Sequence, residues 1–234
     1  MSIFMGSLQD WELDKYKAVS PQLRSILRSR IIRNDLKPRE KVSEPALAKL
    51  YNVSRQPVRE AFITLVNEGL LEILPQRGTI VKAISSEAVL NGRFIREAVE
   101  SDIVAKLAEN PDKEFIAHLR ELIDEQREAA IKTPDLFHSL DEKFHRTLAE
   151  KAGLTVAWDF LDSIKVHMDR VRFITDGKEG EVPVSQLIEH HASIVDGIES
   201  GNSGAAQNAM RIHLQTLLES LPKVKSLHPE YFTD

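Results

Sequence analysis

The spacing of apolar residues changes near residue 85, and this change constrains the fold more than any other feature of the sequence. Before it, short stretches with helical spacing are followed by two apolar runs, 70–74 and 79–81, which the turn sequence Pro75–Gly78 separates. After it, apolar residues recur at helical spacing almost without interruption. The chain therefore divides into a small part with helices and a hairpin and a larger part that is all helical.

The first part is predicted to contain three helices. One covers residues 19–34, a second begins after Ser43, and a third begins after Ser54 and ends at Gly69. Serine caps helix N-termini and glycine ends helices, so these positions are consistent with short helical segments. Three helices followed by a hairpin are the element order of a winged helix-turn-helix.

The second part is predicted to be a bundle of antiparallel helices, because glycine and proline break the pattern and the loops are short. The expected helices lie near residues 86–109, 113–131, 134–152, 155–175, 184–200 and 203–221. The fold class is therefore mainly α, a winged helix-turn-helix followed by an all-α bundle. The expected boundaries are an arm at 1–16, a DNA-binding domain at 17–83, a helical domain at 84–222 and a tail at 223–234.

The charge divides in the same way as the apolar pattern. The whole chain has a net charge of −5, which by itself argues mildly against nucleic acid as a partner. Residues 1–83 carry 14 Lys and Arg against 9 Asp and Glu, whereas residues 84–234 carry 17 against 27. The overall charge is therefore misleading, because the first part is basic enough to bind a polyanion.

Several classes of protein are excluded or disfavoured by what the sequence lacks. It has no cysteine, which excludes disulfides, cysteine zinc fingers, iron–sulfur clusters and thiol nucleophiles. The first ten residues lack the basic and apolar segments of a secretory signal, and no apolar run approaches the ~20 residues of a membrane span. We expect a cytoplasmic protein that does not bind membranes.

Candidate DNA contacts lie at the start of the third predicted helix. Arg55 and Gln56 are in its first turn, where a helix-turn-helix meets base edges, and Arg pairs with guanine as Gln pairs with adenine. Arg59 follows one turn later, and Ser54 and the free N–H groups suit a phosphate. Arg77, at the hairpin tip, is placed for the minor groove or the backbone. The alternative is that all of these are ordinary solvated side chains.

Candidate metal ligands lie in the acidic part. Asp141 and His145 are four residues apart and share one face of a helix, while His191 and His213 lie on later helices. One carboxylate and three imidazoles suit Zn, Ni, Mn or Fe(II) better than Ca or Mg. Spacing alone does not bring the four together, so each histidine can also be an ordinary core or surface residue. His167 is a weaker candidate ligand.

Four runs in the first part, 43–48, 52–61, 68–71 and 75–79, carry a resemblance to a known family. Through them residues 17–83 resemble the DNA-binding domain of GntR-family bacterial transcription regulators. The resemblance implies that double-stranded operator DNA is a partner. The residues that it implies contact DNA are Ser54, Arg55, Gln56, Arg59, Arg77 and Gly78.

Two positions depart from the pattern of that family. Pro38–Arg39 stands where the family usually has Pro-Gly, and glycine suits the positive φ of a type II turn. Arg39 therefore implies either another type of turn or backbone strain. Pro45 stands where some members contact DNA with an arginine, so the operator sequence of those members does not transfer.

Residues 86–222 resemble the FCD domain, the all-helical effector domain of the FadR-type branch of the family. The runs 96–100, 141–145, 191–194 and 210–213 carry this resemblance. Over its whole length the chain most resembles the branch that includes the repressor of the starvation-sensing rsp operon. In metal-binding members one Asp and three His are the ligands. The positions that match are Asp141, His145, His191 and His213.

Four protein ligands leave coordination positions for an effector carboxylate, and arginine is the natural second clamp for such a group. The family position near the pocket makes Arg96 the first choice, with Arg170 or Arg172 as the second. Arg170 and Arg172 can instead form surface salt bridges.

We therefore expect a metal-containing, effector-responsive transcription regulator, a repressor that binds a near-palindromic operator as a homodimer. Zn or Ni is the expected metal, with Mn and Fe as alternatives, and the expected effector is a small carboxylate such as a sugar acid. We expect no enzyme activity and no catalytic residues. Two alternatives stay open: a purely structural metal, and a metal-dependent enzyme domain fused to a DNA-binding module.

Overall fold

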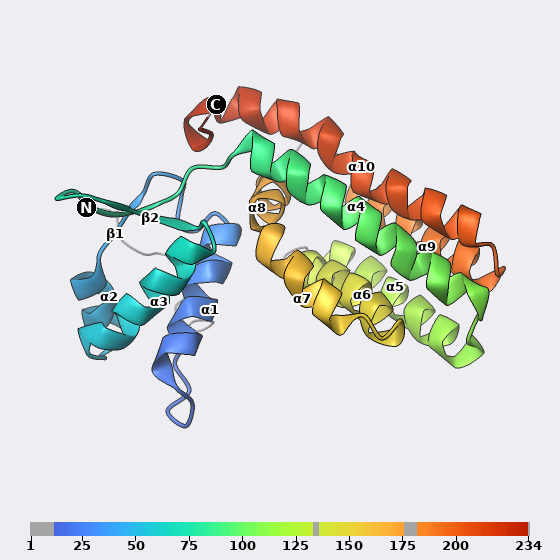
Figure 1. Cartoon of the computed structure of the whole chain (residues 1–234), viewed down its shortest axis with the longest axis horizontal. Helices are drawn as coiled ribbons and strands as arrows, with labels where there is room; N and C mark the ends of the chain where they lie inside the picture. Colours follow the sequence, from blue (N-terminus) through green and yellow to red (C-terminus); the bar gives the residue numbers. More distant parts are fainter. Residues whose placement is uncertain (1–11, 133–135, 176–181, 234) are drawn as a thin grey trace. The chain divides into compact units, whose positions relative to one another are not determined.

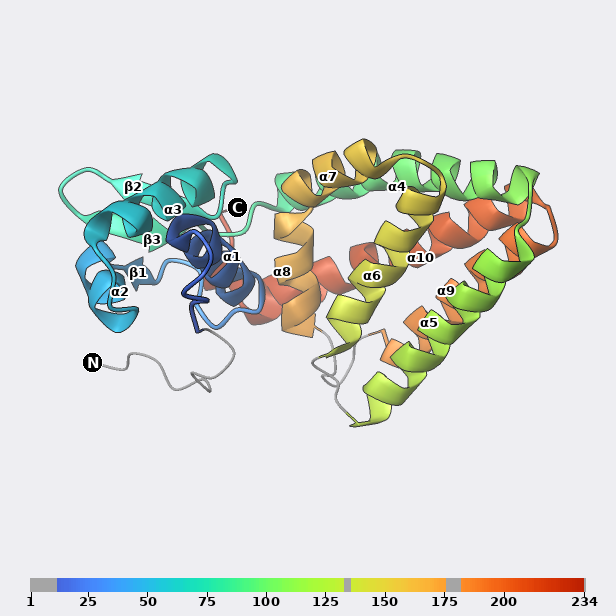
Figure 2. The same cartoon turned by 90° about the horizontal axis from the view of Figure 1, so that it is seen from below.

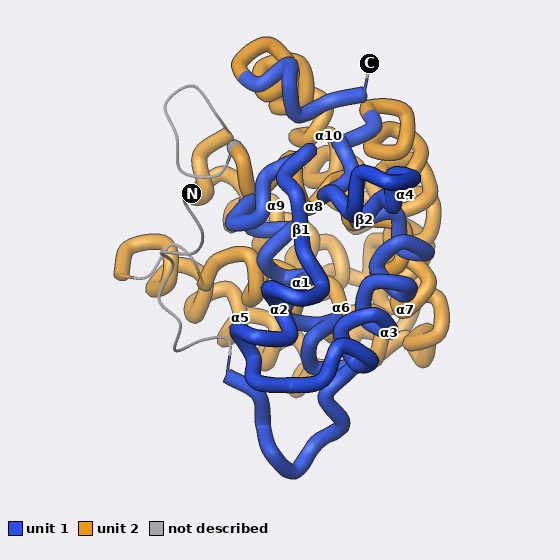
Figure 3. Tube along the Cα trace, turned by 90° about the vertical axis from the view of Figure 1, so that its left-hand side faces the viewer, with its two compact units in different colours: residues 1–85, 228–234 blue, residues 86–227 orange. Residues whose placement is uncertain are grey.

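The computed structural model describes residues 12–132, 136–175 and 182–233, which form two compact units (Figure 3). Unit 1 combines the described residues up to Ser85 with the C-terminal residues from His228 onward. Unit 2 is Ser86–Leu227. Most of the expected N-terminal arm, residues 1–11, lies outside the described residues. Each unit is treated by itself below.

Unit 1 has the winged helix-turn-helix arrangement. Its elements are α1 (Val19–Ile32), β1 (Lys41–Val42), α2 (Glu44–Leu50), α3 (Arg55–Asn67), β2 (Leu71–Leu74), β3 (Gly78–Val81) and the 3₁₀ helix η3 (Pro229–Tyr231). Helix α3 packs against α1 and α2, and β3 lies between β1 and β2 in an antiparallel sheet (Figure 2). Strand β1 was not expected, because two residues are too few to show an alternating pattern.

Local capping rules account for the ends of the helices in unit 1. Ser43 is the N-cap of α2, and its side chain accepts a hydrogen bond from the backbone N–H of Ala46 at 3.4 Å. Ser54 occupies the N-cap position of α3, but its exposed side chain makes no capping hydrogen bond. Gly69 follows α3 with φ of 73°, the left-handed conformation expected of a glycine after a helix.

Pro38 and Arg39 form the middle of a tight turn that the Glu40 N–H closes by donating to the Lys37 carbonyl at 3.0 Å. Arg39 has φ of 67°, which is the left-handed value that position requires in a type II turn. Of the two expectations for Arg39, a different turn type is therefore wrong. The chain keeps the glycine-type turn with an arginine in it, at the cost of backbone strain.

Unit 2 is an all-α bundle (Figures 1 and 2). Its helices are α4 (Ser86–Glu109), α5 (Lys113–Lys132), α6 (Phe137–Lys151), α7 (Thr155–Ile164), α8 (Val166–Thr175), α9 (Val184–Glu199) and α10 (Ser203–Leu227). Helix α10 packs along α4 and α9, and α5 packs against α9 and α6. No helix in the described residues is both long and apolar enough to span a membrane.

Two helix boundaries in unit 2 differ from the expected ones. The spacing predicts a single helix over 155–175, whereas the chain bends at Lys165 between α7 and α8 (Figure 2). The spacing also predicts an end near residue 221, yet α10 continues through Pro222 to Leu227. Leu221 and Val224 are buried on either side of this proline. We attribute the continuation to their packing, which outweighs the hydrogen bond that proline removes.

The core of unit 2 is mostly apolar, and one group among its buried polar side chains gathers beside the aromatic core residues. Phe144, Trp158, Ile194 and Met210 are among the core residues that are less than 2% exposed. Buried polar and charged groups are costly unless they are paired, so their presence in a core marks a site with a specific purpose. The polar residues in question are Arg96, Glu100, Gln126, Asp141, His145, His191 and His213.

Candidate metal centre and nucleic-acid interface

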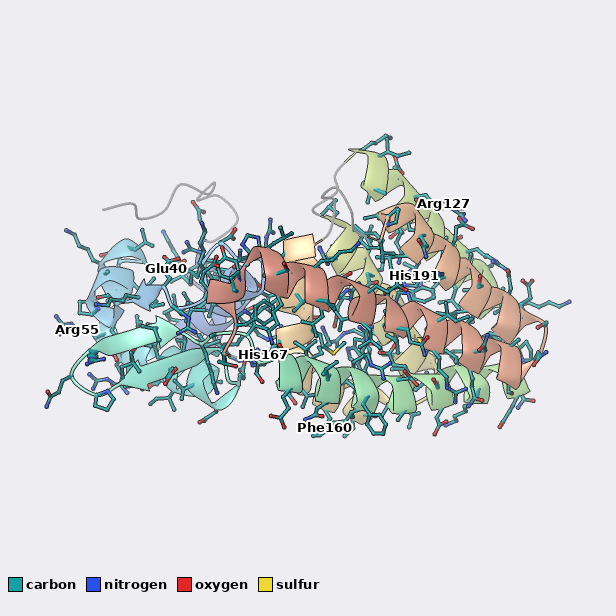
Figure 4. All side chains as sticks on the ribbon, turned by 90° about the horizontal axis from the view of Figure 1, so that it is seen from above. Glu40, Arg55, Arg127, Phe160, His167 and His191 are labelled. Carbon is teal, nitrogen blue, oxygen red and sulfur yellow. The ribbon has the colours of Figure 1, made fainter. Side chains whose placement is uncertain are left out.

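The four predicted metal ligands converge inside unit 2. Asp141 and His145 lie one turn apart on α6, His191 lies on α9 and His213 lies on α10. One ligand atom from each lies within 4.8 Å of the others, and all four residues are buried. Figure 4 labels His191 among the helices of the bundle. Packing between three helices thus makes a group that could hold a metal ion.

Hydrogen bonds fix which nitrogen of two of the rings faces the centre. His145 Nδ1 lies 2.5 Å from Glu100 Oε2, and because a carboxylate only accepts, Nδ1 carries the proton and Nε2 keeps its lone pair. His191 Nδ1 donates in the same way to Gln126 Oε1 at 2.8 Å. The Gln126 amide is oriented by its other end, where Nε2 donates to the Leu140 carbonyl at 3.2 Å.

The ring nitrogens that face the centre lie close to one another and to the Asp141 carboxylate. His145 Nε2 lies 3.1 Å from His213 Nε2 and 3.9 Å from Asp141 Oδ1, and His191 Nε2 lies 3.4 Å from the same oxygen. His191 Nε2 is buried and makes no hydrogen bond with the described residues, whereas Asp141 Oδ1 lies 2.9 Å from the Arg172 guanidinium. A buried ring nitrogen without a partner is unfavourable, and a cation bound between these groups would supply one. The donor set therefore fits a divalent transition metal.

The surroundings hold these groups in the protonation states that bind metals. Burial lowers the pKa of His191 to about 4, although the neighbouring Asp141 opposes this shift. Burial, reinforced by the two other cluster histidines, lowers the pKa of His213 well below its usual value. Burial raises the pKa of Asp141, but Arg172 and the histidines outweigh it and keep that pKa well below the usual range. Neutral imidazoles and an ionised carboxylate are the forms that coordinate a metal.

Two buried residues that sequence reasoning missed support the cluster. Glu100 pairs with both Arg96 and His145; burial raises its pKa, but these two partners outweigh burial and lower that pKa to about 2. Gln126, fully buried on α5, supports His191. Gln126 follows the buried Ile123 by three positions, so a polar residue on an apolar helix face is the signal that could have revealed it.

A pocket adjoins the cluster and shares His213 with it. The pocket has an empty volume of about 470 Å³, open solvent included. It contains two guanidinium groups, two hydroxyls and an apolar wall. Its lining residues are Arg96, Met168, Arg172, Val182, Leu187, His213, Leu214, Thr216, Leu217 and Ser220.

The two arginines considered as the second carboxylate clamp lie in different surroundings. Arg172 lines the pocket, and its guanidinium lies 2.9 Å from Asp141 Oδ1. Arg170 is not among the residues that line the pocket, and burial lowers its pKa to about 10. The structure therefore brings Arg172, rather than Arg170, together with Arg96. His167 is buried on α8 outside the four-residue cluster.

The predicted DNA contacts lie on the surface of unit 1. Arg55, which Figure 4 labels, is exposed in the first turn of α3, as is Gln56. Gln56 donates to the Glu60 carboxylate at 3.0 Å, and the Arg59 guanidinium lies 3.4 Å from the Glu44 carboxylate. Arg77 is exposed at the wing tip between β2 and β3, and Gly78, also exposed, is the first residue of β3.

Comparisons with known proteins agree with this architecture. Residues 20–81 match the family model described as bacterial regulatory proteins, gntR family, and residues 93–216 match the FCD domain. The HTH-type transcriptional repressor RspR of Escherichia coli (strain K12) is 34% identical, over 95% of this chain and 97% of that protein. A probable D-xylose utilization operon transcriptional repressor of Paenarthrobacter nicotinovorans is 29% identical, over 86% and 87%. The structure of E. coli McbR/YncC is similar in fold, with a TM-score of 0.74 at 19% identity, over 88% of this chain and 98% of that one.

A winged helix-turn-helix joined to an all-helical unit with a buried ligand cluster defines a two-unit, DNA-binding transcription regulator. The chain belongs to the GntR family and carries an FCD domain. The family resemblance and the fold class predicted from the sequence are thereby confirmed.

Proposed function

We propose that this protein is a metal-containing transcriptional repressor whose affinity for operator DNA changes when a small carboxylate binds in unit 2. The observation that carries this proposal is that the pocket shares His213 with the ligand cluster and contains two arginines, Arg96 and Arg172. A carboxylate in the pocket can pair with a guanidinium while it faces the cluster.

The ligand set supports a first-row transition metal, since three imidazoles and one carboxylate are a mixed nitrogen and oxygen set. We propose Zn or Ni as the resident ion, with Mn and Fe as alternatives. Asp141, His145, His191 and His213 would hold it. When bound, the metal would supply an open coordination position for an oxygen of the effector.

The lining of the pocket favours a small hydroxylated acid over a fatty or aromatic one. Thr216 and Ser220 offer hydroxyls that can pair with hydroxyls of a ligand, and the two arginines suit its carboxylate. A sugar acid combines these groups. The name of the Paenarthrobacter relative refers to the use of D-xylose, which supports the hydroxylated part of such an effector but not its carboxylate.

For the DNA-binding unit, we propose that Arg55 and Gln56 contact bases and that Ser54 and Arg59 contact phosphates. Arg77 and Gly78 would approach the minor groove or the backbone. The exposure of all six residues supports these roles. A repressor is favoured over an activator because RspR is a repressor by name.

We also propose that the protein is a homodimer, because a two-fold protein binds a two-fold operator. Two exposed apolar pairs at helical spacing in unit 2 support a second copy as the partner. They are Leu90 with Phe94 on α4, and Val156 with Phe160 on α7, where Phe94 is 67% exposed and Val156 84%. Figure 4 labels Phe160. Exposed apolar surface of this kind favours association.

Metal analysis followed by a screen of organic acids tests the proposal. The purified protein should contain a transition metal, and one acid should raise its melting temperature and change its affinity for a DNA duplex selected from random sequences. Bound metal with no responsive acid would favour the structural alternative. Consumption of the acid would favour the enzyme alternative and contradict the proposal.

A further inference from the structure

Two polar side chains outside the ligand cluster each hold one of its histidines. Glu100 of α4 lies 2.5 Å from His145 Nδ1, and Gln126 of α5 accepts from His191 Nδ1 at 2.8 Å. Glu100 is 2% exposed and Gln126 is fully buried. Placing these groups in a core is unfavourable unless their hydrogen bonds are made, so the pairings are specific.

We propose that Glu100 and Gln126 are positioning residues of the metal centre. By keeping the protons of His145 and His191 on Nδ1, they direct the Nε2 lone pairs of both rings toward the cation. Partners of this kind orient ligand histidines and raise their affinity for metals. The inference rests on the proposed function, because it needs a metal to bind the cluster.

Gln126 on α5 forms hydrogen bonds with two other helices, α9 and α6. Its oxygen accepts from His191 on α9, and its nitrogen donates to the carbonyl of Leu140 on α6. Leu140 directly precedes the ligand Asp141. A single amide of α5 therefore sets the tautomer of one ligand and holds it against the helix that provides two others.

Glu100 connects the cluster to the pocket. One carboxylate oxygen pairs with Arg96 Nε and the other with His145 Nδ1. Arg96 lines the pocket, whereas His145 is a predicted ligand. An anion that pairs with Arg96 in the pocket competes with Glu100 for the guanidinium. Binding of the anion and of the metal should therefore be coupled, and equally in both directions.

The chain contains a matched control for Glu100. Arg93 and Glu97 form an ion pair on the same helix with the same four-residue spacing, one turn from the pair of Arg96 and Glu100. Glu97→Gln therefore removes the same charge from the same helix, but not from the cluster. It should bind metal as the wild-type protein does.

The experiment measures the affinity of the full-length protein for Zn²⁺ in competition with a chromophoric chelator. Glu100→Gln and Gln126→Met should each weaken binding by about 10- to 100-fold. Long-range ¹H–¹⁵N spectra of the metal-free protein should place the proton of both rings on Nδ1. In Gln126→Met the Nδ1 assignment of His191 should be lost, which a merely structural role would not cause.

Gln126→Met changes no charge, so it carries the test alone if circular dichroism shows that Glu100→Gln does not fold. If the wild-type protein binds Zn²⁺ and both variants bind it as tightly as Glu97→Gln does, the positioning roles are wrong while the proposed function stands. If the wild-type protein binds none of Zn²⁺, Ni²⁺, Mn²⁺ and Fe²⁺, the proposed function fails, and the inference fails with it.

Discussion

Replacing Arg39 should loosen the C-terminal segment from the rest of unit 1. The Arg39 guanidinium donates to the backbone carbonyls of Glu230 at 2.9 Å and Phe232 at 2.8 Å. Next to these contacts, the N–H of Ile84 donates to the Tyr231 carbonyl at 2.8 Å. The Arg39 side chain, which lies in a strained turn, thus binds the segment that follows α10. These contacts of Arg39 with Glu230 and Phe232, and the neighbouring backbone hydrogen bonds, are called the clasp below.

The size of the effect follows from two opposing contributions. Hydrogen bonds from charged donors contribute ~1.5–3 kcal/mol each, and because Arg39 is exposed we take about 1 kcal/mol each, or about 2 in total. The left-handed φ of Arg39 costs about 1 kcal/mol, which glycine avoids. Arg39→Ala should therefore destabilise the clasp by about 2 kcal/mol and Arg39→Gly by about 1.

Hydrogen exchange measures this effect at two amides of the clasp, those of Ile84 and Thr233, which both donate to backbone carbonyls. A loss of about 2 kcal/mol accelerates exchange by ~30-fold and a loss of about 1 kcal/mol by ~5-fold, provided that exchange occurs by local opening. Lys49→Ala, which removes an exposed cation on α2, is the control. The clasp does not contribute as described if both Arg39 variants exchange at the wild-type rate, or if Arg39→Gly exchanges more slowly than the wild-type protein.

Three further predictions concern DNA and metal. Arg55→Ala should cost ~1–3 kcal/mol in operator binding and relax specificity in a selection from random duplexes; unchanged specificity would remove Arg55 from base readout. His145→Ala combined with His191→Ala should abolish bound metal, and undiminished metal in elemental analysis would contradict the proposed ligand set. Operator affinity measured by fluorescence anisotropy should fall steeply with salt, because phosphate contacts release counterions, and a flat response would count against such contacts.

Short-range patterns were sufficient for most elements. The cap at Ser43, the glycine at Gly69 and the hairpin with its turn follow from preferences of single residues, and the structure has each of them. Nothing in the sequence indicated the bend at Lys165, a residue buried among acidic side chains with its Nζ 2.8 Å from Asp169 Oδ2. The apolar spacing continues on both sides of this bend, and such spacing does not reveal a buried ion pair.

The ligand cluster, too, is predictable from local spacing only in part. A four-residue spacing on one helix places Asp141 and His145 on a common face, and this much is local geometry. Contacts between helices, such as those of Glu100 with His145 and of Gln126 with His191, join residues 45 and 65 positions apart. They depend on how the helices pack: the sequence can mark Gln126 as a polar residue on an apolar helix face, but it does not say which side chain Gln126 meets.

The amino-acid sequence therefore determines the types and order of the chemical groups: a helix with Arg55 and Arg59, a hairpin, and an Asp and three His on successive helices. Only the tertiary structure decided which of these groups meet. It turned Arg172 rather than Arg170 into the pocket and buried Glu100 between an arginine and a histidine. The reason is physical, because a buried charge is tolerated only where packing supplies its partner.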